Sequence, residues 1–328
     1  MKSVKFFSLL VLAMAAGLAF SSCSKDDEGG SGSGSGVTPP AVKPQVAADA
    51  RYVVTAPNSS INSIELTKDM LYIVSEKPSL YMTKSEAEPR ISEGTYTIKD
   101  GIYYLEGWGT MAVRTTDKGV ELDVTPVGAT QATTLTADYE KPIITDNNAK
   151  KLCKSWLFNA FNIKMRVLLS TFDKNYTPQE FHKMPADLKA FLLGAVPAAA
   201  RPAIEEMDVD HIVPWDEKDM EEFSMKRTFT AYGTVVGQNE RRTDIDYWQW
   251  YDQKNGIIWI GDDINHYQRD VEGQESIFAV SYRGSQLYLT LAGLDIEAMM
   301  GEGLPDAVKN LLDAGLDFSA AMIFNPAK

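Results

Sequence analysis

Gly119–Thr125 reads GVELDVT and alternates apolar with polar side chains along its whole length. This period of two is that of a β-strand with one buried and one solvated face. Ser63–Thr67 alternates in the same manner, and Thr95–Leu105 is typical of a hairpin around Asp100-Gly101, a pair that tolerates positive φ at a tight turn. No helical period is visible in this part of the sequence. We therefore predict an antiparallel β-domain over residues 49–140.

Residues 149–328 mix strand and helix patterns, and Ala137–Asn148 is typical of a linker between the two blocks. Thr177-Pro178-Gln179-Glu180 is a capping-box sequence with proline at the first helical position, and it opens a predicted helical insert over about residues 177–224. Pro305 and Gly315 mark the start and the end of a later helix. The predicted strands are Lys151–Phe158, Lys226–Val236, Asp246–Tyr251, Gly256–Ile260, Ile277–Tyr282, Gln286–Leu291 and Phe318–Phe324.

The N-terminus has the layout of a bacterial lipoprotein signal peptide. Lys2 and Lys5 precede an apolar core over Phe6–Phe20, which is shorter than the ~20 residues that a membrane-spanning helix needs. Two serines then precede Cys23, as small residues precede the modified cysteine of a lipobox. We expect residues 1–22 to be removed and Cys23 to carry a lipid anchor. A plain secretory peptide with an incidental cysteine is the alternative.

The segment after Cys23 is typical of a tether. Ser24-Lys25-Asp26-Asp27-Glu28 resembles the acidic export tag of Bacteroidetes-type surface lipoproteins, which implies an outer-membrane location, exposed at the cell surface. Gly29–Gly36 consists of glycine and serine, and three prolines follow, a composition that cannot bury a core. Residues 23–48 are therefore predicted to form the lipidated cysteine and a flexible linker, with the membrane as a partner through Cys23.

Charge and cysteine content exclude several classes of protein. Without residues 1–22, which carry two lysines and no acid, the chain has 30 basic and 45 acidic residues and a net charge of −15. Nucleic acid is therefore not an expected partner, because its binding requires a basic face. Cys153 is the one cysteine besides Cys23, so no disulfide within the chain is expected. The apolar stretch Ala190–Ala200 contains Pro197 and is too short to cross a membrane.

The order of elements in the second block resembles a known family. Leu152-Cys153-Lys154-Ser155-Trp156 reads as a first strand with a tryptophan, and Thr228–Thr234, two hairpins, Leu287–Leu291, short helices and a final strand follow the helical insert. This order is similar to that of the lipocalin-like domains of Bacteroidetes lipoproteins, many of them of unknown function. Ser155 stands where that family usually has glycine. The resemblance covers about residues 150–328 and implies a small antiparallel barrel, without implying a ligand.

The densest aromatic cluster is Tyr247-Trp248-Gln249-Trp250-Tyr251, with Trp259 on the expected partner strand. On a strand, Trp248 and Trp250 point one way and Tyr247 and Tyr251 the other. Such residues could stack on sugar rings or line an apolar cavity. A packed core with ordinary cross-strand pairs is the interpretation that we favour. We expect the tryptophan pair to face into the barrel, with Asp246 at its mouth.

The polar residues form no recognisable active site. Asp262-Asp263-Ile264-Asn265-His266, with Asp270 and Glu272, offers oxygen ligands for Ca²⁺ but lacks the pattern of an EF-hand, and a solvated loop is the simpler interpretation. The nine carboxylates from Glu205 to Glu222 are expected on a polar helix face. The three histidines share no metal-ligand spacing, and no nucleophile or nucleotide motif occurs. We predict no metal site, no cofactor and no catalytic group, and interpret Cys153 as packing.

Three functions remain open. The first is a surface lipoprotein with a non-catalytic barrel that binds a small hydrophobic or sugar ligand. The second is a glycan-binding accessory protein that uses an exposed aromatic strip. The third is a hydrolase whose two carboxylates meet only in the folded chain, about 5–9 Å apart.

Overall fold

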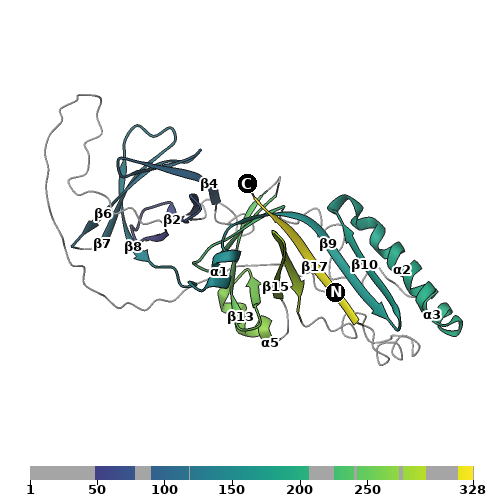
Figure 1. The fold of residues 1–328 in the computed structure, drawn as a ribbon. Helices are drawn as coiled ribbons and strands as arrows, with labels where there is room; N and C mark the ends of the chain where they lie inside the picture. The colour runs from purple at the N-terminus through teal and green to yellow at the C-terminus, as the bar shows by residue number, and fades with distance from the viewer. Residues whose placement is uncertain are drawn as a thin grey trace. The chain divides into compact units, whose positions relative to one another are not determined.

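The computed structural model describes residues 49–77, 90–117, 119–206, 225–239, 242–272, 276–292 and 317–327. These residues fall into two compact units, and the boundary between them in the sequence lies between Lys141 and Pro142. Each unit is described by itself. Both units consist mainly of antiparallel strands, and each contains a closed ring of strands (Figure 1). The predicted mainly β fold is confirmed.

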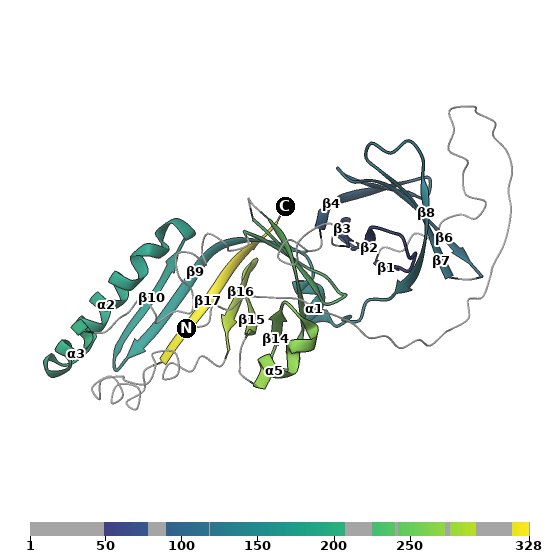
Figure 2. The ribbon, with the colours of Figure 1, turned by 180° about the vertical axis from the view of Figure 1, so that it is seen from behind.

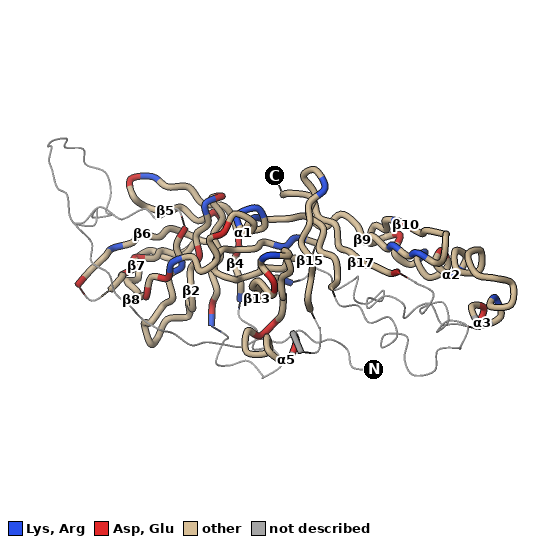
Figure 3. The backbone as a smooth tube through the Cα atoms, turned by 60° about the horizontal axis from the view of Figure 1, so that its bottom comes forward, with Lys and Arg blue, Asp and Glu red and all other residues tan. Residues whose placement is uncertain are grey.

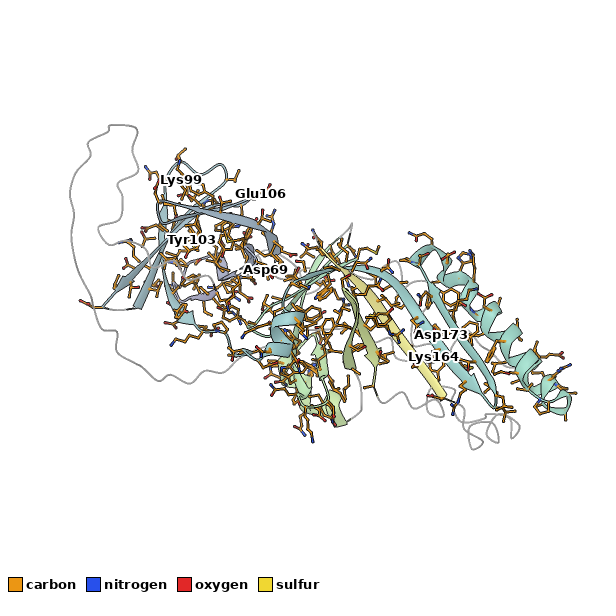
Figure 4. The ribbon with its side chains drawn as sticks, in the orientation of Figure 1. Asp69, Lys99, Tyr103, Glu106, Lys164 and Asp173 are labelled. Carbon is orange, nitrogen blue, oxygen red and sulfur yellow. The ribbon has the colours of Figure 1, made fainter. Side chains whose placement is uncertain are left out.

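The first unit is an eight-stranded barrel in which every strand pairs with the next, and pairing of the first strand with the last closes the ring. Figure 4 labels Tyr103 in this barrel, whose ring is fully buried against Tyr96. The strands are β1 (Ala50–Val54), β2 (Ile61–Leu66), β3 (Leu71–Glu76), β4 (Arg90–Lys99), β5 (Ile102–Leu105), β6 (Gly109–Thr116), β7 (Gly119–Pro126) and β8 (Thr133–Glu140).

The period of two in the sequence corresponds to the inside and the outside of this barrel. Leu122 and Val124 of β7 are buried in its core, whereas Glu121 pairs with the outward-facing Arg114. The predicted turn is also present: Asp100 and Gly101 have φ values of 52° and 77° and join β4 to β5. Closure of the sheet was not predicted, and the predicted linker at Ala137–Asn148 is wrong at its start, because β8 runs to Glu140 and pairs with β1.

The second unit contains a ring of eight strands in the order β9-β11-β12-β13-β14-β15-β16-β17, closed by pairing of β17 with β9. β10 lies outside the ring and pairs with β9 alone among the strands described. The strands are β9 (Ser155–Val167), β10 (Ser170–Tyr176), β11 (Lys226–Phe229), β12 (Thr234–Gln238), β13 (Thr243–Asp252), β14 (Ile257–Gly261), β15 (Ile277–Arg283), β16 (Gln286–Leu291) and β17 (Asp317–Pro326).

Two predicted strands of this unit are wrong in their bounds. Lys151–Phe158 was expected to be one strand, but its start belongs to helix α1 (Asn147–Leu152), which Asp146 caps by accepting two backbone hydrogen bonds. Lys226–Val236 is not one strand but the β11–β12 hairpin, because the chain turns at Gly233, where φ is 77°. The alternation of apolar and polar residues did not reveal the helix before β9 or the turn between β11 and β12.

Helical elements cover the inner face of the β9–β10 hairpin. The expected helix start at Thr177 is confirmed, although the first turns form a 3-10 helix, Pro178–Lys183, before α2 (Met184–Ala195) and α3 (Arg201–Glu206). Figure 2 shows α2 running beside β9 and β10. The ring of Phe191 lies 5.4 Å from that of Phe172 on β10, and Leu188 and Leu192 are buried in the same core as the barrel interior.

Several predicted segments lie outside the described residues: the signal peptide, Cys23, the tether, the insert beyond residue 206 and the helix between Pro305 and Gly315. Within the residues that the structure describes, no helix is long and apolar enough to cross a membrane.

Candidate functional site

Trp248 and Trp250 point into the second barrel, as their shared parity on β13 predicts. Trp248 is 1% exposed, and its indole Nε1 donates a hydrogen bond to the backbone oxygen of Thr230 at 2.9 Å. Trp250 packs against the same core, and its Nε1 donates to Asp146 Oδ2 at 2.8 Å. Both polar indole groups are thus used within the chain. The two tryptophans form packed core and not a flat, open strip.

Helix α1 packs against the core of this barrel through Ala149 and Leu152. One oxygen of Asp146 caps the helix and the other accepts the hydrogen bond from Trp250. Trp156, at the start of β9, donates to the backbone oxygen of Leu152 at 2.8 Å. Tyr282 packs 6.2 Å from the ring of Trp156, and burial raises the pKa of Tyr282 to about 12. Aromatic side chains therefore fill the space beside α1.

Trp259 lies on the partner strand, as predicted, but on the opposite face. It pairs with Gln249 across β13 and β14, and it is fully buried under helix α5 (Tyr267–Glu272). Its ring packs edge-on to Tyr267, and its Nε1 lies 3.3 Å from Asp270 Oδ2. The ring also lies directly over Gly261, where a Cβ would approach it to 2.1 Å.

Tyr247 and Tyr251 face outward, and Tyr251 is 45% exposed. The five aromatic residues singled out in the sequence are therefore divided between the barrel core, the space under α5 and the outer surface. The structure does not bring them together as one binding surface.

Charged side chains occupy a different part of the inner wall. Asp244 and Asp246 have the same parity on β13 as Trp248 and so face inward. Arg227 of β11 reaches Asp246, with Nη1 and Oδ2 4.0 Å apart and both side chains about one-sixth exposed. Gly237 lies between the two strands, paired with Arg227 on one side and Asp244 on the other. Because it has no side chain, the guanidinium can cross β12 toward the acids.

Asp262 extends this group of charges. It follows Gly261, which pairs with Tyr247, so Asp262 lies next to Asp246 across β13 and β14. Burial raises the pKa of Asp262 to about 6, with Asp246 and Asp270 acting in the same direction and His266 against it. His266 Nδ1 lies 3.6 Å from Asp262 Oδ1. We call Arg227, Asp244, Asp246, Asp262 and His266 the charged wall.

The solvated loop expected at Asp262–His266 is wrong. Asp262 and Asp263 are buried, and Asp263 caps a short helical turn by accepting a hydrogen bond from the backbone of Asn265 at 2.8 Å. Among the described residues, no group of three or more acidic, histidine or cysteine side chains could hold a metal ion. Most of the acidic run from Glu205 to Glu222 lies outside the described part of the chain.

The charged wall combines an arginine, three carboxylates and an imidazole beside an apolar core. Burial also raises the pKa of Asp246, while Arg227 opposes this effect. Carboxyl groups with raised pKa values, held inside a fold, are typical of sites that bind or transform polar ligands. Such groups can accept hydrogen bonds from hydroxyl or amino groups, and the guanidinium can donate to oxygen atoms.

Only part of this site could be predicted from the sequence. Asp246 was expected at the mouth of the barrel. Arg227 was assigned no role, although it lies two residues before Phe229 and therefore on the same face of the strand. Asp262 was noted only as part of an acidic loop. The two meet Asp246 through pairing of β11, β12, β13 and β14, which no local motif encodes.

Figure 3 shows acidic and basic positions interspersed along the described strands. Comparison of the chain with family models, with curated proteins and with solved structures finds no match. The charged wall is therefore interpreted from its own geometry.

Proposed function

We propose that this chain is an outer-membrane lipoprotein, anchored through Cys23 and exposed at the cell surface, whose second barrel is a non-catalytic binding module. The proposed ligand is a small polar molecule of the sugar class, held at the charged wall. The anchor rests on the lipobox-like sequence before Cys23, and the ligand class rests on the barrel.

The observation that carries the ligand class is the ion pair of Arg227 and Asp246, with Asp262 beside it, inside an otherwise apolar barrel. A buried ion pair contributes little to stability, because the loss of hydration offsets the attraction of the two charges. Packing alone therefore gives little reason for these residues to be charged. Hydrogen bonding to a polar ligand does give such a reason.

A panel of neutral, amino and acidic sugars tests the proposal. A ligand that binds only the folded chain raises the midpoint of thermal unfolding. We expect at least one class of sugar to do so for the wild type, and Asp246→Asn to remove the shift. Asp252→Asn is the matched control, because Asp252 ends the same strand but is hydrogen-bonded to Asn255 at the surface. If no sugar shifts the midpoint, or if Asp246→Asn keeps the full shift, the proposed ligand class is rejected.

The double variant Arg227→Met and Asp246→Leu controls for loss of binding that is caused by misfolding. Replacement of a buried ion pair by apolar residues of similar size is often neutral or stabilising. This double variant should therefore unfold at a midpoint close to that of the wild type and show no response to the sugar. A variant that still responds would place the ligand elsewhere.

A hydrolase is the second candidate, favoured by the adjacent carboxylates of Asp246 and Asp262 and by the pKa of about 6 for Asp262. A carboxyl group of this kind can donate a proton near neutral pH, while a second carboxylate acts as base or nucleophile. Hydrolysis of nitrophenyl glycosides that Asp262→Asn abolishes would favour this candidate. The glycan-binding strip has no comparable support, since Trp248 and Trp250 are packed in the core.

A further inference from the structure

The β9–β10 hairpin ends in two leucines that the fold leaves in water. Val167 pairs with Ser170, so Leu168 and Leu169 form a two-residue loop. Leu168 is 46% exposed and Leu169 is fully exposed, whereas Val167 is buried. We call Leu168 and Leu169 the tip. Figures 1 and 2 show β9 and β10 running away from α1, so the tip lies far from this helix.

The tip also breaks a rule of local conformation. Leu168 has a φ of 54°, a value that hairpin loops normally assign to glycine, asparagine or aspartate. The corresponding loop of the first barrel follows the rule with Asp100-Gly101. Nothing in the described fold benefits from leucine at either position. Positions that violate local preference without a structural gain are expected at functional sites.

The surroundings of the tip are polar but balanced in charge. Lys164 and Asp173 pair across β9 and β10, as Figure 4 shows, and Arg166 pairs with Asp317 on β17. All four side chains are exposed. Attraction to a strongly charged partner is therefore weak, and the apolar area of the tip is the dominant driving force for contact.

We propose that the tip inserts into the lipid layer that holds the acyl chains of Cys23. This inference rests on the proposed membrane anchor. The 25 residues between Cys23 and Asp49 can span at most ~90 Å, which keeps the folded units near the membrane. At such an effective concentration, even a weak second contact is populated. A single apolar contact is reversible, so it orients the chain on the surface without replacing the anchor.

Sedimentation with phosphatidylcholine vesicles tests the tip separately from the anchor. The probe is the chain from residue 23 onward with Cys23→Ser, which carries no acyl chain. We expect it to bind weakly and independently of salt. The double substitution Leu168→Gly and Leu169→Asn suits the backbone of the loop and should fold, while lowering the partition coefficient at least about tenfold, as expected for losing one buried leucine or more. Leu157→Ser, at the other end of β9 and 43% exposed, should leave binding unchanged.

A second readout follows the tip itself. Leu169→Trp fluorescence should be quenched by brominated lipids more than that of the unsubstituted chain. Equal binding of the wild type and the double variant, or binding that requires anionic lipid, would overturn the proposal. A double variant that changes only self-association in the ultracentrifuge would also overturn it, in favour of contact with a second copy. The probe has no acyl chain, so this assay tests only the tip. Failure of the proposed anchor at Cys23 would instead be detected by fatty-acid labelling.

Discussion

Substitution of Asp262 tests whether the charged wall is as desolvated as the structure indicates. Asp262→Asn keeps the shape of the side chain but removes its ability to ionise. The pKa of Asp262 rises from the ordinary 3.8 to about 6, mainly because of burial. Between these two values the folded chain binds more protons than the unfolded chain, so Asp262 makes the protein less stable as the pH rises through this window. Above pH 6 the full penalty applies.

The size of the effect follows from the two pKa values. At 1.36 kcal/mol per pKa unit, the difference corresponds to at most about 3 kcal/mol. Wild type and Asp262→Asn should therefore be similarly stable near pH 4, and the variant should be more stable by up to about 3 kcal/mol at pH 8. Urea unfolding followed by tryptophan fluorescence is the suitable assay, because five of the six tryptophans lie in residues 142–328.

Asp252→Asn provides a control of opposite sign. Hydrogen bonds from Asn255 hold the pKa of Asp252 below its ordinary value, so its carboxylate stabilises the folded chain above pH 4 and this contribution is lost as the pH falls. This variant should not gain stability at pH 8. If Asp262→Asn gains no stability at pH 8, or if its gain persists at pH 4, the carboxyl group of Asp262 is not buried as described.

Three further predictions concern the core and the anchor. Trp248→Ala should lower the free energy of unfolding by about 3–5 kcal/mol, as expected for removing a large core side chain, and a loss below 1 kcal/mol in urea unfolding would contradict its packed position. Gly261→Ala should destabilise the fold because its Cβ would clash with the ring of Trp259; an unchanged thermal midpoint would show that this ring lies elsewhere. Fatty-acid labelling of cells should mark the wild type but not Cys23→Ser, and equal labelling of both would disprove the anchor.

The sequence predicts the strands of this protein better than their closure. Period-two patterns locate β2 and β7, because alternate residues of each strand lie in the core of the first barrel. Pairing of β1 with β8 and of β9 with β17 joins segments far apart in the chain, and no local pattern specifies it. β10 was missed because its alternation is hidden: Lys174 shares a face with Phe172 and Tyr176 and binds Asp187 of α2.

The candidate site was predicted less well, for a related reason. The aromatic cluster is conspicuous in the sequence because its members are neighbours on one strand. The charged wall is inconspicuous because Arg227 lies on β11, Asp246 on β13 and Asp262 just after β14, with Gly237 of β12 creating the space between the first two. A cluster of neighbouring residues on one strand can therefore be found in the sequence. A site whose residues come together only through the pairing of several strands cannot.

The tryptophans and the carboxylates inside the second barrel differ in how far the protein itself satisfies their polar groups. Trp156, Trp248 and Trp250 each donate their indole hydrogen to an oxygen of the same chain, so packing satisfies them completely. Burial raises the pKa of Asp262 and that of Asp246, and the charged partners His266 and Arg227 oppose this effect. A ligand with hydroxyl or amino groups can donate further hydrogen bonds to such carboxylates. For this reason we propose the charged wall as the binding site, whereas Trp248 and Trp250 belong to the packed core.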